Sequence, residues 1–409
     1  MRSSILCGLI RGYFYNTIHC CYFRSLGILE AWRVFISGLY GLNTKALFLN
    51  KNYSFSELFG PSTFSLSDPH SLEEVVANKT ILVTGAGGSI GSALCDKIAP
   101  LRPHKLILLG RGEHSLYTAS RGLTTNYPDL YLEIALADIQ DNEQLYHVFT
   151  NYKPEIVFHT AAYKHVNMLE RFPSQAVLNN VLGTRNVMRV CQDSQVERLA
   201  FISTDKAVEP TSVLGATKKL CECILRQHAQ NSVTDLVSVR FGNVFRSSGN
   251  VVALFEQQAQ TDRRITITDP NAKRFYMDVE DATITVLSAT KEALNGEVAI
   301  MHMDEPVTIG ALADELVKSL GLKPNEDVRY DYIGLQPGEK LRERLYTEVE
   351  EENMRRVGPM MYTKTDMRGF SYDESVIETL LECARAQDDA KVKTFLASCV
   401  PGYTPVGGE

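Results

Sequence analysis

The stretch from Lys79 to Ser92, KTILVTGAGGSIGS, constrains the fold of this 409-residue chain more than any other. An apolar, β-branched run of the kind buried in parallel sheets ends there in a cluster of glycines, and a helical pattern begins at Ser89. The spacing of Gly85, Gly88 and Gly91 predicts a strand, a tight turn and a helix N-terminus, whose free N–H groups suit a pyrophosphate. A glycine triplet alone is equally typical of an ordinary loop, but the flanking strand and helix favour a dinucleotide site.

Strands and helices alternate after this stretch. Further apolar runs that indicate strands are residues 105–109, 131–135, 155–158 and 198–203, with helical patterns between them. This alternation predicts an α/β fold with a Rossmann-type doubly wound parallel sheet. We expect a catalytic domain over residues 79–409, with a nucleotide-binding core at about 79–245 and a smaller C-terminal substrate-binding lobe mainly at about 246–409.

The first 50 residues diverge from the rest, because four arginines face a single acidic residue in an apolar and aromatic background. No uncharged run reaches the roughly 18 residues that a membrane helix needs, so no transmembrane helix is predicted. An interfacial amphipathic anchor, a transit-like presequence and a poorly ordered arm all remain open for this segment. Residues 51–78, rich in Ser and Pro before a helical stretch, are predicted to be a linker.

Composition narrows the class of protein. A formal net charge of −7 and a pI near 5.8 argue against a nucleic-acid binder. The nine cysteines include no C-x-x-C pair, and Cys221 and Cys223 lie in a helical stretch where packing is their ordinary role. We therefore expect a reducing, cytoplasmic location without a metal site, and peripheral association with the inner face of a membrane through residues 1–50 stays open.

The end of the second predicted strand bears on the cofactor. An acidic residue about 20 positions past the glycines would select NAD, but this chain has Gly110 followed by Arg111. The missing carboxylate and the added cation favour NADP slightly over NAD, with Glu113 as a substitute acid and a solvated Arg111 as the alternatives. After the third predicted strand, Asp138 is placed to contact the adenine, and a helix N-cap is the alternative role.

The fifth predicted strand ends in STDKA, residues 203–207, followed by GATK at residues 215–218. Strand ends at the carboxyl edge of such a sheet face the cofactor, so Thr204, Asp205 and Lys206 are expected beside the nicotinamide. A hydroxyl, a carboxyl and an amine in succession have no packing role at a strand end. The alternative interpretation is a capped turn.

In chain order, the motifs TGAGGSIGS, AAYKHV, NNVLGT, STDKA, GATK, RFGNV with SSG, and PGEKL resemble the CapD-like polysaccharide biosynthesis proteins. These are nucleotide-sugar 4,6-dehydratases of the extended short-chain dehydrogenase/reductase superfamily, acting mainly on UDP-N-acetylglucosamine. The resemblance covers roughly residues 59–405. It implies a lyase with bound NADP or NAD, a UDP-sugar substrate, and a homo-oligomer formed through the helices at about residues 174–192 and 212–227.

The residues and the resemblance together imply three groups of site positions. The expected catalytic residues are Thr204, Asp205 and Lys206, and no metal ligands are implied. The expected cofactor-binding residues are Gly85, Gly88, Ser89, Ile90, Gly91, Arg111, Asp138, Ile139, Ala161, Ala162 and Lys218. The expected substrate-binding residues are Tyr163, Lys164, His165, Asn243, Ser248, Arg274 and Glu339.

The chain departs from the family pattern at several positions. The superfamily's general base is a Tyr four residues before a Lys, and here Leu214 precedes Lys218. The family's membrane-bound branch has Met in place of that Tyr, so an apolar residue is similar to a branch feature, and Lys218 would hold the nicotinamide ribose. Gln336 stands where the family usually has an Arg that grips the diphosphate, and Asp304 replaces a usual Gly.

The resemblance also implies a mechanism. The cofactor takes a hydride from carbon 4, with Thr204 hydrogen-bonding the 4-hydroxyl, and later returns the hydride to carbon 6. Lys206 is the expected base at carbon 5, which requires burial to lower its pKa, and Asp205 is the expected acid at the 6-hydroxyl, which requires burial to raise its pKa. The alternatives are a nucleotide-sugar epimerase and a non-catalytic NAD(P)-binding regulator on the same fold.

Overall fold

The computed structural model describes residues 53–60, 69–370 and 373–405. All of them belong to one compact unit that begins at Tyr53. The arm or anchor predicted over residues 1–50 lies outside the described residues, so its interpretations stay open. Among the residues that are described, no helix is both long and apolar enough to cross a membrane.

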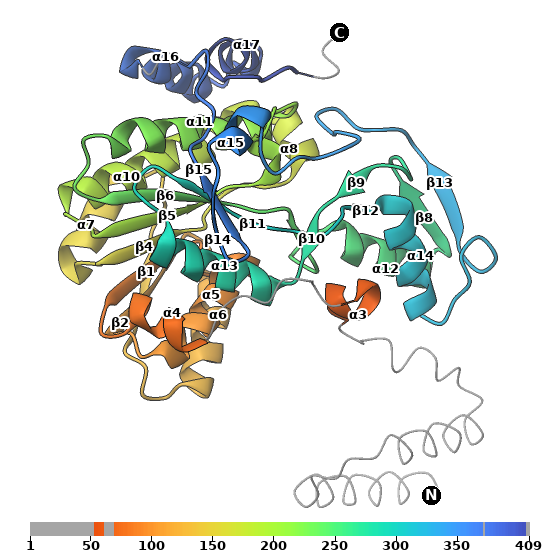
Figure 1. Ribbon diagram of the computed structural model, residues 1–409, viewed down its shortest axis with the longest axis horizontal. Coiled ribbons are helices and arrows are strands. Elements are labelled where there is room, and N and C mark those ends of the chain that lie inside the picture. Colours follow the sequence, from red (N-terminus) through yellow and green to blue (C-terminus); the bar gives the residue numbers. More distant parts are fainter. Residues whose placement is uncertain (1–52, 61–68, 371–372, 406–409) are drawn as a thin grey trace, which may run out of the picture. The chain divides into compact units, whose positions relative to one another are not determined.

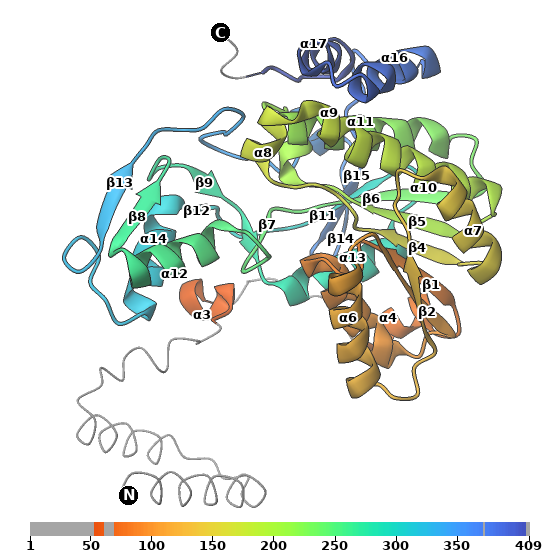
Figure 2. The same ribbon diagram turned by 180° about the vertical axis from the view of Figure 1, so that it is seen from behind.

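A nine-stranded sheet runs through this unit in the order β14-β15-β11-β6-β5-β4-β1-β2-β3 (Figure 1, Figure 2). Its strands are β1 (Thr80–Thr84), β2 (Lys105–Gly110), β3 (Leu132–Leu136), β4 (Ile156–His159), β5 (Arg198–Ile202), β6 (Asp235–Arg240), β11 (Val298–Met301), β14 (Arg355–Val357) and β15 (Met360–Thr363). Strand β15 is antiparallel to both neighbours, and the remaining pairs are parallel. The predicted doubly wound parallel sheet is confirmed, and the order reverses between β1 and β4, where such folds bind nucleotides.

The four later strands predicted from apolar runs are all present, and their ends lie within one residue of the predicted ends. Strand β1 shows why these runs become strands, because every one of its residues is buried. Leu82 lies opposite Ile107 of β2 and Val157 of β4. An apolar run flanked on both sides and covered on both faces is typical of a central parallel strand.

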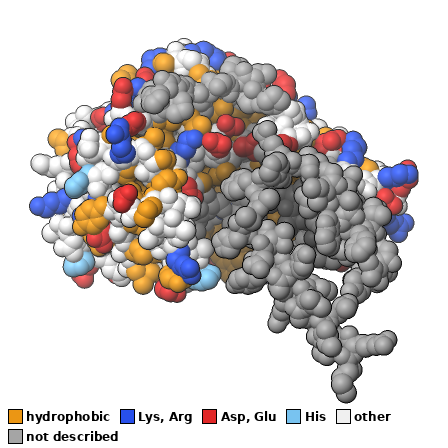
Figure 3. Space-filling model, turned by 90° about the horizontal axis from the view of Figure 1, so that it is seen from below, with side chains coloured by type: hydrophobic (Ala, Val, Ile, Leu, Met, Phe, Trp, Pro, Cys, Tyr) orange, Lys and Arg blue, Asp and Glu red, His pale blue; other side chains and the backbone are white. Residues whose placement is uncertain are grey.

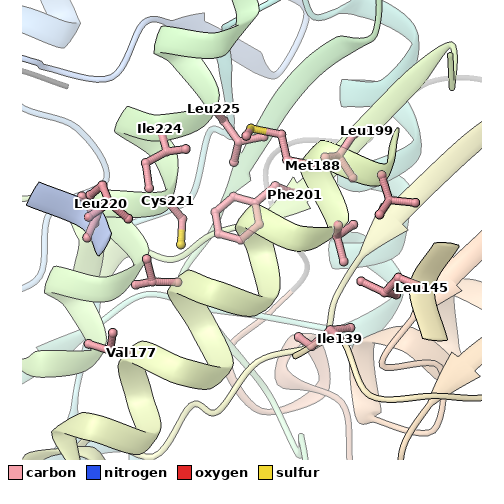
Figure 4. Close-up of a cluster of buried hydrophobic side chains, with 14 of the residues drawn as sticks. Ile139, Leu145, Val177, Met188, Leu199, Phe201, Leu220, Cys221, Ile224 and Leu225 are labelled. Carbon is pink, nitrogen blue, oxygen red and sulfur yellow. The ribbon is translucent and has the colours of Figure 1, made fainter. Parts of the chain in front are cut away.

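Helices cover both faces of the sheet. One face carries α4 (Pro69–Val76), α5 (Ser89–Ile98), the short η2 (Ala99–Leu101), α6 (Glu113–Asn126) and α13 (Val279–Glu292). The other carries α7 (Asn142–Tyr152), α8 (Val166–Arg171), α9 (Pro173–Ala176), η3 (Val177–Leu182), α10 (Gly183–Asp193) and α11 (Val213–Ala229). Successive residues of β1 alternate between the two cores, with Ile81 in the first and Leu82 in the second. Figure 4 shows the second core, where Phe201 lies among Met188 and Cys221.

The stretch predicted to be a linker, residues 51–78, contributes to the folded unit wherever it is described. Leu72 and Val76 of α4 are buried in the core beside α13. The short helix α3 (Phe55–Phe59) packs on the C-terminal lobe, with the ring of Phe55 5.7 Å from that of Tyr276. The structure therefore differs from the prediction, because apolar side chains of this stretch complete two separate cores.

The C-terminal lobe has its own apolar core. Its elements are β7 (Asn243–Val244), α12 (Val251–Thr261), β8 (Arg264–Ile267), β9 (Lys273–Arg274), β10 (Tyr276–Met277), β12 (Val307–Thr308), α14 (Ile309–Ser319) and β13 (Arg329–Tyr332). The remainder of residues 246–409 does not belong to this lobe. Strands β11, β14 and β15 join the main sheet, and α13 and α15 (Glu348–Glu352) lie with them.

The last two helices, α16 (Glu374–Arg385) and α17 (Asp389–Cys399), pack on α9, η3 and α11 (Figure 1). The buried guanidinium of Arg185 in α10 pairs with Glu374 at 2.9 Å and Glu378 at 2.7 Å. The Ser174 hydroxyl donates to Asp389 at 2.5 Å. These two helices thus cover part of the surface through which the resemblance implies self-association.

Charge is mixed over the outer surface. On the face seen in Figure 3, acidic and basic side chains of the described residues are interspersed, with apolar side chains between them. This distribution accords with the moderate net charge of −7 for the whole chain.

Candidate active site

The glycine-rich turn follows β1 at the switch point of the sheet. Gly85 has φ +66°, and a Cβ there would lie 2.7 Å from the Cα of Ala161, in the loop after β4. A Cβ on Gly91 would lie 2.3 Å from the Gly85 carbonyl oxygen. Only glycine fits both positions, because the glycine-rich turn lies close to the loop after β4 and to the first turn of α5.

Helix α5 begins directly after this turn. Gly88 is its N-cap, and no side chain caps the first turn of the helix in the described structure. The first-turn N–H groups at Ser89 and Ile90 are therefore open to a ligand, and the positive end of the helix dipole favours an anion. The turn and this helix end together fit the pyrophosphate of a dinucleotide, as the sequence predicts.

Arg111 and Asp138 meet at the ends of β2 and β3. The Arg111 guanidinium lies 3.3 Å from Asp138 and 4.9 Å from the centre of the Tyr163 ring, and it also donates to the Tyr163 hydroxyl. The Tyr163 hydrogen bond raises the pKa of Arg111, with a smaller contribution from Asp138. Arg111 keeps 44% of its side-chain exposure, so a phosphate can still reach it.

Ile139 lies close to this cluster but does not face it. Its side chain is buried in the core, where a Cβ on Gly183 would lie 2.5 Å from it, and its carbonyl accepts from Asn186. Any contact of Ile139 with the cofactor would therefore have to use its backbone, and the cofactor-binding role of Ile139 stays a prediction.

The loop after β4 carries Ala161, Ala162 and the three residues expected to face the sugar, and the structure divides those three. Tyr163 points to Arg111, on the cofactor side. Lys164 donates to Ser247 at 3.2 Å, and a Cβ on Gly249 would lie 2.7 Å from the His165 ring. Lys164 and His165 therefore face the loop between β7 and α12, whereas Tyr163 contacts Arg111, and the substrate-binding role of all three stays a prediction.

Asn180 fixes this loop, a role that the motif NNVLGT did not reveal. Its side-chain oxygen accepts from the Tyr163 N–H at 2.9 Å, and its amide donates to the Tyr163 carbonyl at 3.1 Å. The same amide lies 3.3 Å from the Thr217 hydroxyl of α11. Asn180 is 1% exposed, so these bonds hold the loop in place without contact with solvent.

Ser248 joins the lobe to the glycine-rich turn. Its hydroxyl lies 2.9 Å from that of Ser89, and its N–H donates to the Ser89 hydroxyl at 2.9 Å. These two hydrogen bonds hold the loop at Ser248 against the glycine-rich turn.

The row of Thr204, Asp205 and Lys206 follows β5, and the short helix η4 (Asp205–Ala207) orders it. The Thr204 hydroxyl donates to Asp205 Oδ1 at 2.9 Å, and Lys206 Nζ donates to the same oxygen at 3.0 Å. Lys206 also donates to the Asn243 side chain at 3.3 Å. The second oxygen of Asp205, Oδ2, is buried and has no hydrogen-bond partner among the described residues.

Burial and neighbouring charges shift the pKa values of Asp205 and Lys206. Burial raises the pKa of Asp205, and nearby Glu343 raises it further, against the opposing effect of Lys206. Burial lowers the pKa of Lys206, but the carboxylates of Asp205 and Glu343 outweigh it, so the net pKa of Lys206 is raised. The direction predicted for Asp205 is found. The lowered pKa predicted for Lys206 concerns the complex with the oxidised nicotinamide and stays a prediction, while in the protein alone the two carboxylates raise this pKa.

Glu343 is the main site residue that sequence reasoning missed. It is 4% exposed and lies 3.8 Å from Lys206 and 3.3 Å from Lys340. The positive charge of Arg274 in β9 acts to lower the pKa of both Glu343 and Lys206, so Arg274 lies near the row of Thr204, Asp205 and Lys206. The sequence feature that could have identified Glu343 is its position, three residues after the PGEK motif.

Glu339, predicted to bind substrate, closes a local turn. Its carboxylate accepts from the Gln336 N–H at 3.1 Å. The next residue, Lys340, donates to the Val208 carbonyl at 2.6 Å, and the Thr211 hydroxyl donates to Gly338 at 3.1 Å. The PGEK segment therefore anchors to the chain just after the catalytic row.

Lys218 and Leu214 lie one helical turn apart on α11 but have different surroundings. Lys218 Nζ donates to the Ile202 carbonyl at 2.7 Å and lies 4.4 Å from the Phe201 ring. Burial lowers the pKa of Lys218 to about 8. Leu214 is 4% exposed and packs in the core, where it offers neither a donor nor an acceptor.

A buried cluster of ion pairs contacts the residue that precedes the row of Thr204, Asp205 and Lys206. Arg240 is fully buried and pairs with Glu222 at 2.5 Å and Glu350 at 2.9 Å. The Ser203 hydroxyl, one residue before Thr204, donates to Glu222 at 2.5 Å. The cluster thereby joins β6, α11 and α15 to the start of the catalytic row.

Comparison with known proteins finds a family and individual relatives. The sequence model of the family described as "Polysaccharide biosynthesis protein" matches residues 81–365. The capsular polysaccharide biosynthesis protein CapD of Staphylococcus aureus is 40% identical over 302 residues, which are 73% of this chain and 50% of that protein. The chain therefore spans about half the length of this relative.

Two further relatives carry activity names. The UDP-N-acetylglucosamine 4,6-dehydratase (inverting) of Campylobacter jejuni is 31% identical over 65% of this chain and 76% of that protein. A UDP-glucose 4-epimerase of Rickettsia felis is 29% identical over 76% of this chain and 90% of that protein.

Solved structures share the fold. The X-ray structure of Pen from Bacillus thuringiensis has a TM-score of 0.67 and 30% identity, covering 71% of this chain and 90% of that one. The dTDP-glucose 4,6-dehydratase DesIV from Streptomyces venezuelae, solved with NAD, has a TM-score of 0.58 at 22% identity, covering 65% of this chain and 90% of that one.

Proposed function

Because this chain belongs to the polysaccharide biosynthesis protein family, we propose that it is a nucleotide-sugar 4,6-dehydratase that converts UDP-N-acetylglucosamine to its 4-keto-6-deoxy derivative. One observation carries this proposal. Asp205 is fully buried and its pKa is raised, while Lys206 lies 3.0 Å away at the same strand end. A carboxyl with a raised pKa beside an amine is suited to the removal of water, because one proton must be donated and another removed.

A bound NADP or NAD would supply the site that accepts a hydride from the sugar and returns it. The protein's part is to hold this group. The first-turn N–H groups of α5 suit its pyrophosphate, and Arg111 suits a 2′-phosphate. Lys218 of α11, which donates to the Ile202 carbonyl at the end of β5, would hold the nicotinamide ribose.

Asp205 is the proposed acid. It is closed to solvent, whereas Thr204 beside it is half-buried, so a sugar meets the Thr204 hydroxyl first. That hydroxyl lies 2.9 Å from Asp205 and can pass protons between the sugar hydroxyls and the carboxyl. The unpartnered Oδ2 of Asp205 favours the neutral carboxyl, because no donor stabilises a charge there.

Lys206 is the proposed base at carbon 5. Its side chain keeps 17% exposure, so it borders the site, and its bond to Asn243 directs it there. Its raised pKa means that it carries a proton before substrate binds. The ammonium must lose that proton before it can act as a base.

An epimerase is the second candidate function, and the Rickettsia felis relative supports it. Incubation of the purified protein with UDP-N-acetylglucosamine and NADP distinguishes the two reactions. A dehydratase yields a product that is lighter by one water, while an epimerase leaves the mass unchanged and inverts carbon 4.

We expect the protein to bind NADP at least as tightly as NAD, and Arg111→Ala to weaken NADP binding roughly tenfold with a smaller change for NAD. The reason is that Arg111 offers a charged hydrogen bond to the 2′-phosphate, which NAD lacks. Calorimetric titration with each dinucleotide measures this. Arg121→Ala, on the exposed surface of α6, is the matched control and should change neither affinity. A tenfold preference of the unmodified protein for NAD would contradict the expectation.

The sugar nucleotide would be held by groups on the lobe side of the row. Lys164 and His165 face the loop at Ser248, and Arg274 supplies a buried cation near Lys206. These residues support a negatively charged substrate such as a UDP-sugar. Self-association remains part of the proposal and would have to use surface that α16 and α17 leave open.

A further inference from the structure

Glu343 is buried at the edge of the catalytic row, and the mechanism so far gives it no task. Its side chain is 3% exposed and lies 3.8 Å from Lys206. Its Oε2 lies 3.3 Å from Lys340 but has no hydrogen bond of good geometry among the described residues. Burial alone would raise the pKa of Glu343, but Lys206, Lys340 and Arg274 outweigh it and lower this pKa, so the carboxylate depends on these three cations.

The groups that face Glu343 come from several elements. Lys340 is on its own segment, Lys206 comes from η4, and the charge of Arg274 acts from β9. Asp205 lies 3.0 Å from the same amine. The Lys206 amine is therefore close to two buried carboxyls, Asp205 and Glu343.

The proposed base needs such an arrangement, because an ammonium cannot remove the carbon 5 proton. Resting on the proposed dehydratase function, we infer that Glu343 takes the proton of Lys206 when the sugar closes the site, which leaves Lys206 as a free amine. Exclusion of water disfavours both charges of the ion pair, so the neutral amine and the neutral acid gain relative to it. Glu343 acts through Lys206 and does not touch the sugar.

The protons balance over one turnover. The Lys206 ammonium and the Glu343 carboxylate become an amine and a carboxylic acid. The amine then takes the proton from carbon 5, and the electron pair of that C–H bond forms the carbon 5–carbon 6 double bond as the carbon 6–oxygen bond breaks. Oxidation of carbon 4 releases the 4-hydroxyl proton, which Thr204 passes to Asp205 across 2.9 Å, and Asp205 donates a proton to the leaving oxygen, giving water. As the hydride returns to carbon 6, Lys206 gives the proton that it took back to carbon 5, and Glu343 then returns the first proton to the Lys206 amine, which restores the starting state.

Glu343→Gln tests this inference, because the amide keeps the shape but cannot accept a proton. The unmodified protein should show a kcat that is nearly independent of pH between about pH 6 and pH 8, since the proton moves internally. The Gln variant should be at least about tenfold slower at neutral pH and should recover about tenfold per pH unit, because Lys206 must then lose its proton to water. Glu343→Asp should keep the flat profile, and Glu348→Gln, on the exposed start of α15, should match the unmodified protein.

A second readout separates this inference from the proposed function. Addition of UDP-N-acetylglucosamine to the NADP-loaded protein should produce a new protonated-carboxyl band in the infrared difference spectrum, and Glu343→Gln should lack it. If that band appears but no water is lost from the sugar, the proton transfer stands and the dehydratase function fails. If water is lost while the Gln variant keeps the flat profile or the band, Glu343 is not the acceptor.

Discussion

Replacing Asp205 by asparagine is expected to reduce turnover of UDP-N-acetylglucosamine by about 10²–10⁴, the usual contribution of general acid or base catalysis. The amide keeps the size of the side chain and the bonds at Oδ1, but it has no acidic proton to give to the departing hydroxyl. Lys206→Ala should lose activity on the same order because it removes the base. NADP binding should be unchanged in both variants, since neither side chain belongs to the glycine-rich turn.

Leu214→Ala is the control for this pair. Leu214 occupies the position of the superfamily's usual base, but it packs in the core, so its loss should reduce kcat per folded molecule far less. Steady-state kinetics on folded, cofactor-loaded protein give the comparison. Near-normal turnover by Asp205→Asn, or a larger loss of kcat for Leu214→Ala than for either polar variant, would contradict the assignment of Asp205 as the acid and Lys206 as the base.

Arg240→Met is expected to lower the free energy of unfolding by about 3–5 kcal/mol, because it leaves Glu222 and Glu350 buried without their shared cation. Urea unfolding followed by circular dichroism measures this loss. Arg264→Met is the control, since Arg264 makes an exposed pair with Asp331 and should cost at most about 1 kcal/mol. An equal loss of unfolding free energy in the two variants would show that the buried cluster stabilises the fold no more than an exposed ion pair does.

The same cluster predicts a pH dependence of stability. Burial alone would raise the pKa of Glu350, but Arg240 and Lys219 outweigh it and lower this pKa to about 2. The stabilisation from Glu350 is therefore complete above the ordinary carboxyl pKa of 4.5 and is lost as the pH falls toward 2. The Arg240→Met variant should lack this part of the acid sensitivity.

The sheet could largely be predicted from the sequence, because each buried parallel strand is a continuous apolar run next to a turn of small residues. The resemblance to CapD-like polysaccharide biosynthesis proteins is confirmed by the family match and the 40% identity to CapD. Strand β14 could not be predicted from an apolar run, because it is three residues long and mostly exposed. Its place in the sheet depends on β15 pairing with β11, a contact between distant segments.

The catalytic row could be found because three polar residues at a strand end have no packing role. Its charge state could not, since the pKa of Lys206 depends on Glu343, which a remote loop brings within 3.8 Å. The contact between Tyr163 and Arg111 could not be predicted either, because it joins two segments that are distant in the sequence.

The most direct test of the proposed function follows the hydrogen on carbon 4. UDP-N-acetylglucosamine carrying deuterium at carbon 4 is incubated with the protein and catalytic NADP, and the product is analysed by mass spectrometry and NMR. The proposed dehydratase predicts a product lighter by one water, with the deuterium moved to carbon 6 and no net reduction of the cofactor. A product of unchanged mass with carbon 4 inverted, or recovery of unaltered substrate, would contradict it.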